Sequence, residues 1–146
     1  MLTVVCETPN KLIAQNRDIP TRSPDQVLLR VKRVGVCGTD LHIFAGNQPY
    51  LQYPRVMGHE LSGIVEQAPS GSHLAVGDTV YVMPYISCGT CIACRQGKTN
   101  CCVNIQVLGV HRDGAGHAKA ALPDREAKRD ADGEREQAQR DAMHPA

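Results

Sequence analysis

The chain has 146 residues, and its 16 Lys and Arg residues nearly balance 15 Asp and Glu residues, for a net charge of +1. This length predicts a single domain with one hydrophobic core, and the balanced charge argues against nucleic acid or an anionic membrane as a partner. A small molecule is therefore the expected partner. The chain begins with neither a basic leader nor an apolar run of signal-peptide length, and no later run approaches a membrane span, so we expect a cytoplasmic protein.

Short runs of β-branched and apolar residues alternate with Gly and Pro before Asp113. Runs of this length and spacing predict strands rather than helices. The predicted strands cover residues 2–6, 26–36, 61–67 and 79–83. Several short strands so close together predict a mostly β fold, and a barrel is the favoured architecture.

The composition changes at Asp113. Beyond this residue the apolar positions are almost all Ala, and only Leu122 and Met143 are large enough to anchor a core. Charges of both signs dominate without an apolar stripe at helical spacing, which predicts disorder or a solvated helix. We therefore expect the folded domain to cover residues 1–114 and residues 115–146 to lie outside it. An abrupt change of this kind is also typical of a shifted reading frame.

Several of the seven cysteines lie close together, at spacings typical of metal ligands rather than of a disulfide framework. Two-residue gaps let neighbouring thiolates reach one zinc ion at about 2.3 Å, and four thiolates close a tetrahedral site that leaves no room for substrate. This predicts a structural zinc that replaces a core under residues 86–104. A redox pair is the alternative, but it needs only two cysteines. The predicted ligands are Cys88, Cys91, Cys94 and one of the adjacent Cys101 and Cys102.

A second group of polar residues begins at the end of the strand predicted over residues 26–36. It contains the residue types of a catalytic zinc site, which has three protein ligands and one open position. By themselves these residues fit a buried thiol and ordinary surface histidines equally well. The group consists of Cys37, Thr39, Asp40, His42, His59 and Glu60.

The order of these motifs resembles the zinc-containing medium-chain dehydrogenase/reductase family, which includes the alcohol dehydrogenases. The resemblance covers residues 1–114 and implies a GroES-like, partly open β-barrel with a four-cysteine zinc lobe. Residues 46–50, 53–60 and 97–102 are most similar to bacterial sugar-acid dehydrogenases of the L-galactonate 5-dehydrogenase type. The motifs are Gly35-x-Cys37-Gly38-Thr39-Asp40-x-His42, Gly58-His59-Glu60-x-x-Gly63, Gly77-Asp78-x-Val80 and the four-cysteine segment.

The resemblance implies which residues bind metal. Cys37 and His59 would bind a catalytic zinc, with Glu60 as a direct ligand or as a nearby carboxylate that exchanges with water. The zinc would lower the pKa of a bound secondary alcohol, so that hydride can leave toward a nicotinamide ring. In the lobe, the family spacing favours Cys102 as the structural ligand and leaves Cys101 outside the site.

The same resemblance implies catalytic roles for Thr39, His42 and Asp40. Thr39 would accept the alcohol proton, and His42 would pass it toward solvent. Asp40 would accept a hydrogen bond from the ring nitrogen of His59 that does not bind metal. Cys6 is expected to be a buried apolar residue. The remaining histidines are expected at the surface, and they are His73, His111, His117 and His144.

Full-length members of this family bind NAD or NADP mainly through a second, nucleotide-binding domain. Gly114 and Gly116 do not form a dinucleotide fingerprint, because Lys119 occupies the position of its third small residue and no βαβ pattern follows. We therefore expect a chain without a Rossmann domain, a fragment of an oxidoreductase for a polyol or sugar acid that is inactive alone. Homo-oligomers are possible in its full-length relatives. The alternative is a non-catalytic, zinc-stabilised fold that serves interaction.

Overall fold

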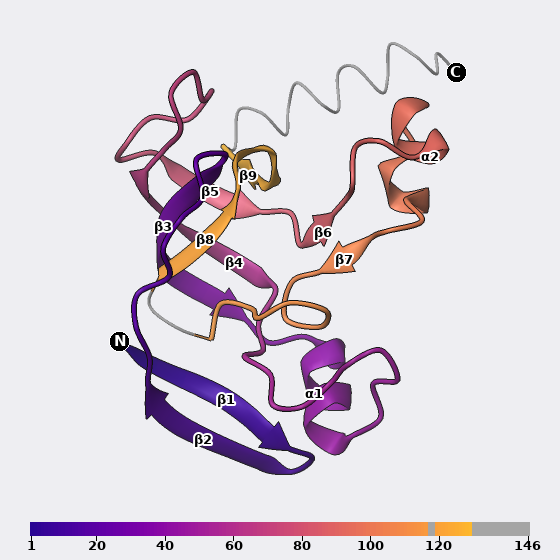
Figure 1. Cartoon of the computed structure of the whole chain (residues 1–146). Coiled ribbons are helices and arrows are strands. Elements are labelled where there is room, and N and C mark those ends of the chain that lie inside the picture. The colour runs from indigo at the N-terminus through magenta and orange to yellow at the C-terminus, as the bar shows by residue number, and fades with distance from the viewer. Residues whose placement is uncertain (117–118, 130–146) are drawn as a thin grey trace, which may run out of the picture.

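A computed structural model describes residues 1–116 and 119–129, and these form a mostly β structure (Figure 1). It consists of a two-stranded hairpin, a five-stranded sheet and a lobe that contains a second pair of strands. The lobe projects from the sheet, away from the hairpin (Figure 1).

The hairpin pairs β1 (Leu2–Thr8) with β2 (Lys11–Asn16) in antiparallel register. Asn10 lies in its turn with a φ of 62°, a left-handed conformation that Asn tolerates better than most residues. Cys6 is fully buried on β1, as expected, and it exchanges two backbone hydrogen bonds with Arg55. This exchange attaches the hairpin to the segment that precedes β4.

The five-stranded sheet has the order β8-β3-β4-β5-β9, and every neighbouring pair is antiparallel. Its strands are β3 (Gln26–Gly35), β4 (Glu60–Gln67), β5 (Thr79–Val82), β8 (Lys119–Pro123) and β9 (Ala127–Lys128). The register between β3 and β4 shifts at two places, and such bulges bend and twist a strand. The sheet curls into a partly open barrel (Figure 1). Its inner face is filled by alternating apolar residues, which include Val27, Leu29, Leu61, Val65, Val80, Val82 and Leu122.

The helical elements are short and lie beyond the strand ends. Helix α1 (Gly38–Ala45) follows β3 and buries Ile43 in a second, smaller core with Cys6. In the lobe, β6 (Tyr85–Ile86) pairs with β7 (Gln106–Val107). Between them lie helix α2 (Ile92–Arg95) and the 3-10 turn η1 (Thr99–Cys101), and a further 3-10 turn, η2 (Asp124–Glu126), joins β8 to β9.

The four predicted strands are confirmed as β1, β3, β4 and β5. The sequence pattern did not reveal β2 or α1, because β2 is mostly exposed and α1 spans only eight residues. Among residues 1–116 and 119–129, the structure contains no helix that is long and apolar enough to span a membrane.

The expectation that residues 115–146 lie outside the folded domain is wrong for residues 115–116 and 119–129, and residues 117–118 lie outside the described residues. Strand β8 pairs with β3 over its full length, and β9 pairs with β5. Ala120, Leu122 and Ala127 are each at most 4% exposed and belong to the barrel core. Small Ala side chains carry little hydrophobic signal, but they fit beside a neighbouring strand that also satisfies their backbone groups. Residues 130–146, where the rest of the expected tail lies, are outside the described residues.

Replacing Leu122 with Ala should therefore destabilise the barrel, although this residue lies beyond the sequence-based boundary. A fully buried Leu that becomes Ala lowers the free energy of unfolding by about 2–5 kcal/mol. The control is Leu2→Ala, because Leu2 is 64% exposed and should change the free energy by about 0.5 kcal/mol or less. Urea denaturation measures both values. Equal effects of the two substitutions would mean that β8 is not part of the core.

Glu126 predicts a pH-dependent stability. Burial raises the pKa of this carboxyl group above its usual 4.5, although the adjacent Arg125 acts in the opposite direction. The favourable contribution of this carboxyl group to the free energy of unfolding is therefore complete below pH 4.5, and it is lost as the pH rises through the raised pKa. Glu126→Gln has no carboxyl group to ionise and therefore does not lose this stability. As the pH rises through the raised pKa, the melting temperature of Glu126→Gln should increase relative to that of the parent chain. Asp18→Asn, at an exposed position, is the control for removing a charge. A difference between Glu126→Gln and the parent that does not vary with pH would contradict the assignment.

Candidate metal centres

Cys37 lies at the junction between β3 and α1, where it caps the helix. Its Sγ accepts a hydrogen bond from the backbone N–H of Thr39 at 3.3 Å, and the Asp40 carboxylate accepts one from the backbone N–H of Cys37 at 3.0 Å. This reciprocal capping satisfies N–H groups that have no partner within the helix. As a result, the direction of the Cys37 thiol is set by the start of α1.

His59 reaches the same place from the beginning of the neighbouring strand. Strands β3 and β4 pair with Gly35 opposite Glu60, so the residues just after β3 and just before β4 become neighbours. Cys37 Sγ lies 3.0 Å from His59 Nε2, although 22 positions separate the two residues in the sequence. Thiol and imidazole are thus placed side by side by the strand register.

Asp40 is the third member of this group. Only 3% of the residue is exposed, and its Oδ1 accepts a hydrogen bond from the backbone N–H of Gly58 at 3.3 Å. The same oxygen lies 3.7 Å from His59 Nδ1, which is beyond hydrogen-bond distance. That Nδ1 atom is buried and makes no hydrogen bond within the described residues. One ligand atom each of Cys37, Asp40 and His59 lies within 4.8 Å of the others.

The remaining residues of the predicted catalytic group lie outside this cluster. Thr39 is half-buried and His42 is exposed, and both are on α1, three positions apart, where helical side chains are neighbours. Glu60 is exposed at the first position of β4. Its carboxylate lies over Gly35, because a Cβ atom at position 35 would come within 2.7 Å of Glu60 Oε2. The structure thus brings together Cys37, Asp40 and His59, and it leaves Glu60 outside this group.

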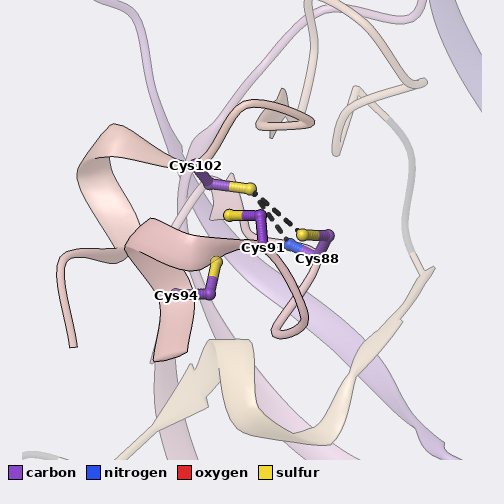
Figure 2. A group of neighbouring side chains, drawn as sticks. All are labelled: Cys88, Cys91, Cys94 and Cys102. Carbon is purple, nitrogen blue, oxygen red and sulfur yellow. Dashed lines mark hydrogen bonds between the residues drawn. The ribbon is translucent and has the colours of Figure 1, made fainter. Parts of the chain in front are cut away.

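The four cysteines of the lobe converge, and their side chains point toward one another (Figure 2). All four Sγ atoms lie within 4.8 Å of one another. Cys91 caps α2 and Cys94 lies on it, while Cys88 and Cys102 approach from the two sides of the helix-containing loop. Cys102 Sγ lies 3.5 Å from Cys88 Sγ and also accepts the backbone N–H of Cys88 at 3.3 Å. Cys101 is exposed and is not in the cluster, which agrees with the expected choice of Cys102.

Backbone N–H groups in the lobe favour thiolates. Hydrogen bonds from Thr90, first from its backbone and then from its side chain, lower the pKa of Cys88 to about 5. The backbone N–H groups of Cys94 and Val103 lower the pKa of Cys91. For Cys94 the balance is reversed, since burial and then the neighbouring Cys91 sulfur raise its pKa to about 11. Thiolates at Cys88 and Cys91 therefore keep a proton on Cys94. A bound cation removes this repulsion between like charges.

The other histidines within the described residues are at the surface, as expected. His73 and His111 are exposed, with His73 Nδ1 lying 3.5 Å from Asp124 Oδ2 and the His111 ring stacked on Tyr50. His117 and His144 lie outside the described residues. Sequence reasoning did not assign a role to Gly58, whose N–H binds Asp40. Its φ of 94° requires the conformational freedom of glycine. The sequence signal that could have indicated this role is that the glycine directly precedes the predicted ligand His59.

The comparisons with known proteins agree with this arrangement. Residues 23–128 match the family described as the alcohol dehydrogenase GroES-like domain. The chain belongs to this family. It is 43% identical over 124 residues to L-galactonate-5-dehydrogenase of Escherichia coli K12, and the match covers 84% of this chain and 36% of that protein. The barrel with its cysteine lobe is accordingly the GroES-like fold of zinc-type alcohol dehydrogenases, as expected from the sequence motifs.

Two solved structures are also similar to this GroES-like domain. An Escherichia coli CFT073 alcohol dehydrogenase, solved with NADH, has a TM-score of 0.80 at 42% identity, covering 88% of this chain and 38% of that one. Galactitol-1-phosphate dehydrogenase of Escherichia coli has a TM-score of 0.80 at 30% identity, covering 88% and 37%. The chain thus spans little more than a third of the length of these relatives.

Both clusters fit zinc by their donor chemistry. Four thiols that converge from a short loop match a closed tetrahedral site. The thiol of Cys37 and the imidazole of His59 are donors typical of an open site, and the buried Nδ1 of His59 faces Asp40 so that Nε2 remains for the metal.

Replacing Cys91 with Ser should release about one zinc ion per chain and loosen the lobe, because so short a loop depends on its metal for folding. Cys101→Ser is the matched control, since it removes an adjacent thiol outside the cluster and should leave the zinc content unchanged. Atomic absorption and hydrogen exchange across residues 86–104 measure both effects. Full metal content with unchanged protection in Cys91→Ser would show that the lobe does not depend on four thiolates.

Proposed function

We propose that this chain is the catalytic, zinc-binding part of a dehydrogenase that oxidises a secondary alcohol of a polyol or sugar acid with NAD or NADP. The observation that carries the proposal is the contact between Cys37 and His59, with buried Asp40 behind the imidazole. This is the donor set of an open zinc site, and it lies within a domain of the alcohol dehydrogenase family. All seven cysteines are free, in keeping with the reducing cytoplasm as its compartment.

When bound at Cys37 and His59, zinc supplies Lewis acidity that lowers the pKa of an alcohol oxygen. The direction of the Cys37 thiol is set by the helix cap, and Asp40 faces His59 Nδ1 at 3.7 Å, on the side from which a carboxylate orients a metal-binding imidazole. The Glu60 carboxylate lies over Gly35, two positions before Cys37, and is not a member of the cluster. This position suits a carboxylate that binds the metal only when the substrate or water position is vacant.

Thr39 and His42 provide the route for the alcohol proton. Their spacing on α1 makes them neighbours, and Thr39 is half-buried whereas His42 is exposed to solvent. Thr39 accepts the proton from the alcohol oxygen, and His42 delivers it to water. In the overall reaction, the carbinol carbon gives its hydride to the nicotinamide and the oxygen gives its proton to this route, which leaves a carbonyl compound.

The substrate class and the cofactor rest on the relatives. L-galactonate-5-dehydrogenase acts, by its name, on a sugar acid, and galactitol-1-phosphate dehydrogenase acts on a polyol phosphate. The similar Escherichia coli CFT073 enzyme was solved with NADH. This chain spans only 36–38% of the length of the first and the last of those proteins. We therefore expect that catalysis requires the remaining part of such an enzyme.

The zinc content of the purified chain distinguishes an assembled catalytic site from a structural lobe alone. We expect about two zinc ions per chain, falling to about one in Cys37→Ala. Cys101→Ser again serves as the matched thiol control. A parent chain with about one zinc ion, unchanged by Cys37→Ala, would favour the alternative of a non-catalytic, zinc-stabilised interaction module.

The zinc-loaded chain alone should produce no more NADH than Cys37→Ala when it is given NAD and a panel of polyols and sugar acids. Hydride transfer requires the nicotinamide ring within about 3–3.5 Å of the carbinol carbon, and this positioning accounts for much of the rate. Mass spectrometry of the same sample checks that no nucleotide-binding partner has co-purified. A Cys37-dependent rate from the pure chain would show that the remaining part is dispensable.

A further inference from the structure

The carboxylate of Asp113 joins three segments that are far apart in the sequence. Its Oδ1 accepts hydrogen bonds from the backbone N–H of Val56 at 3.1 Å and from Arg55 Nη1 at 3.2 Å. Its Oδ2 accepts one from Arg17 Nη1, just beyond β2, at 2.9 Å. The segment that leads directly to His59 is thus attached to Asp113 at its beginning.

The residues after Asp113 continue this attachment along the backbone. The N–H groups of Gly114, Gly116 and Ala115 donate to the carbonyls of Val56, Met57 and Gly58, respectively, at 2.7–2.9 Å. A Cβ atom on Gly114 would lie 2.2 Å from the Gly58 carbonyl oxygen, so the two backbones are in closest contact. Every carbonyl from position 56 to 58 is therefore held by the segment 113–116.

Residues 55–58 also contact the metal cluster. The N–H of Gly58 donates to Asp40, which in turn lies next to the His59 ring. From these contacts we infer that Asp113 is a positioning residue for the His59 ligand. It acts through the backbone of residues 55–58, and the inference rests on the proposed role of Cys37 and His59 as ligands.

For positioning residues 55–58, the ion pairs of Asp113 contribute less than its hydrogen bond with the backbone N–H of Val56. The side chains of Asp113 and Arg17 are 43% and 35% exposed, and ion pairs of this kind contribute little to stability. The bond from the Val56 N–H to the carboxylate is charge-assisted and has no flexible donor. Residues that orient a metal ligand in this way change metal affinity by about 10–100-fold when they are replaced.

Titration of the metal-free full chain with Co²⁺ tests the inference. A site with four thiolates absorbs more strongly than a site with one, so the two cobalt sites can be followed separately. Asp113→Ala should weaken cobalt binding at Cys37 and His59 by about tenfold or more and leave the cysteine lobe unchanged. Asp113→Asn should lose less, because its amide oxygen can still accept the Val56 N–H. The control is Asp124→Ala, which removes a carboxylate bonded to Ser72, away from residues 55–58.

Hydrogen exchange of the Gly58 amide in the metal-free chain provides a second measurement. Asp113→Ala should speed this exchange, because the Gly58 bond to Asp40 depends on the position of the segment. Parental cobalt affinity or parental Gly58 exchange in Asp113→Ala would overturn the inference. If the parent chain bound no cobalt at Cys37 and His59, the proposed function would fail, and the exchange of Gly58 would still decide whether Asp113 positions the segment.

Discussion

The pairing of β3 with β4 is the constraint on which the rest of this structure depends. Because Gly35 lies opposite Glu60, the chain leaves one strand at Cys37 and enters the other at His59 in the same place. A shift of one residue in this register would turn the side chains of β4 to the opposite face and would separate the thiol from the imidazole. The core residues Leu29 and Val65, which pair across the two strands and are at most 1% exposed, oppose such a shift.

The two cysteine-containing sites differ in how they are assembled. The lobe draws its four thiols from residues 88–102, around one short helix, so its geometry is largely local. The cluster of Cys37, Asp40 and His59 draws on two strands and a helix cap, and its neighbours extend to residue 113. The geometry of the lobe is therefore set locally, whereas that of the open site depends on the packing of the whole barrel. This division suits an enzyme that needs one closed and one accessible zinc.

The chain belongs to the alcohol dehydrogenase GroES-like domain family and matches little more than a third of the length of its relatives. The barrel is nonetheless completed by β8 and β9, which lie beyond the point where the recognisable motifs end. Residues 119–129 are thus part of the metal-binding domain and add two strands at the two edges of its sheet.

The sequence by itself determined the metal chemistry and the main strands. Cysteine spacing is local, so Cys88, Cys91 and Cys94 could be recognised from the sequence, the family motifs favoured Cys102 over Cys101, and short β-branched and apolar runs identified β3, β4 and β5. Family motifs identified Cys37, Asp40 and His59, but spacing alone left them open to other readings. Only the tertiary structure decided that Ala120 and Ala127 are core residues, that the Glu60 carboxylate lies over Gly35, and that Asp113 is bonded to the segment before His59. Each of these facts depends on which strands and loops become neighbours, and local sequence carries no record of contacts between segments that are far apart along the chain.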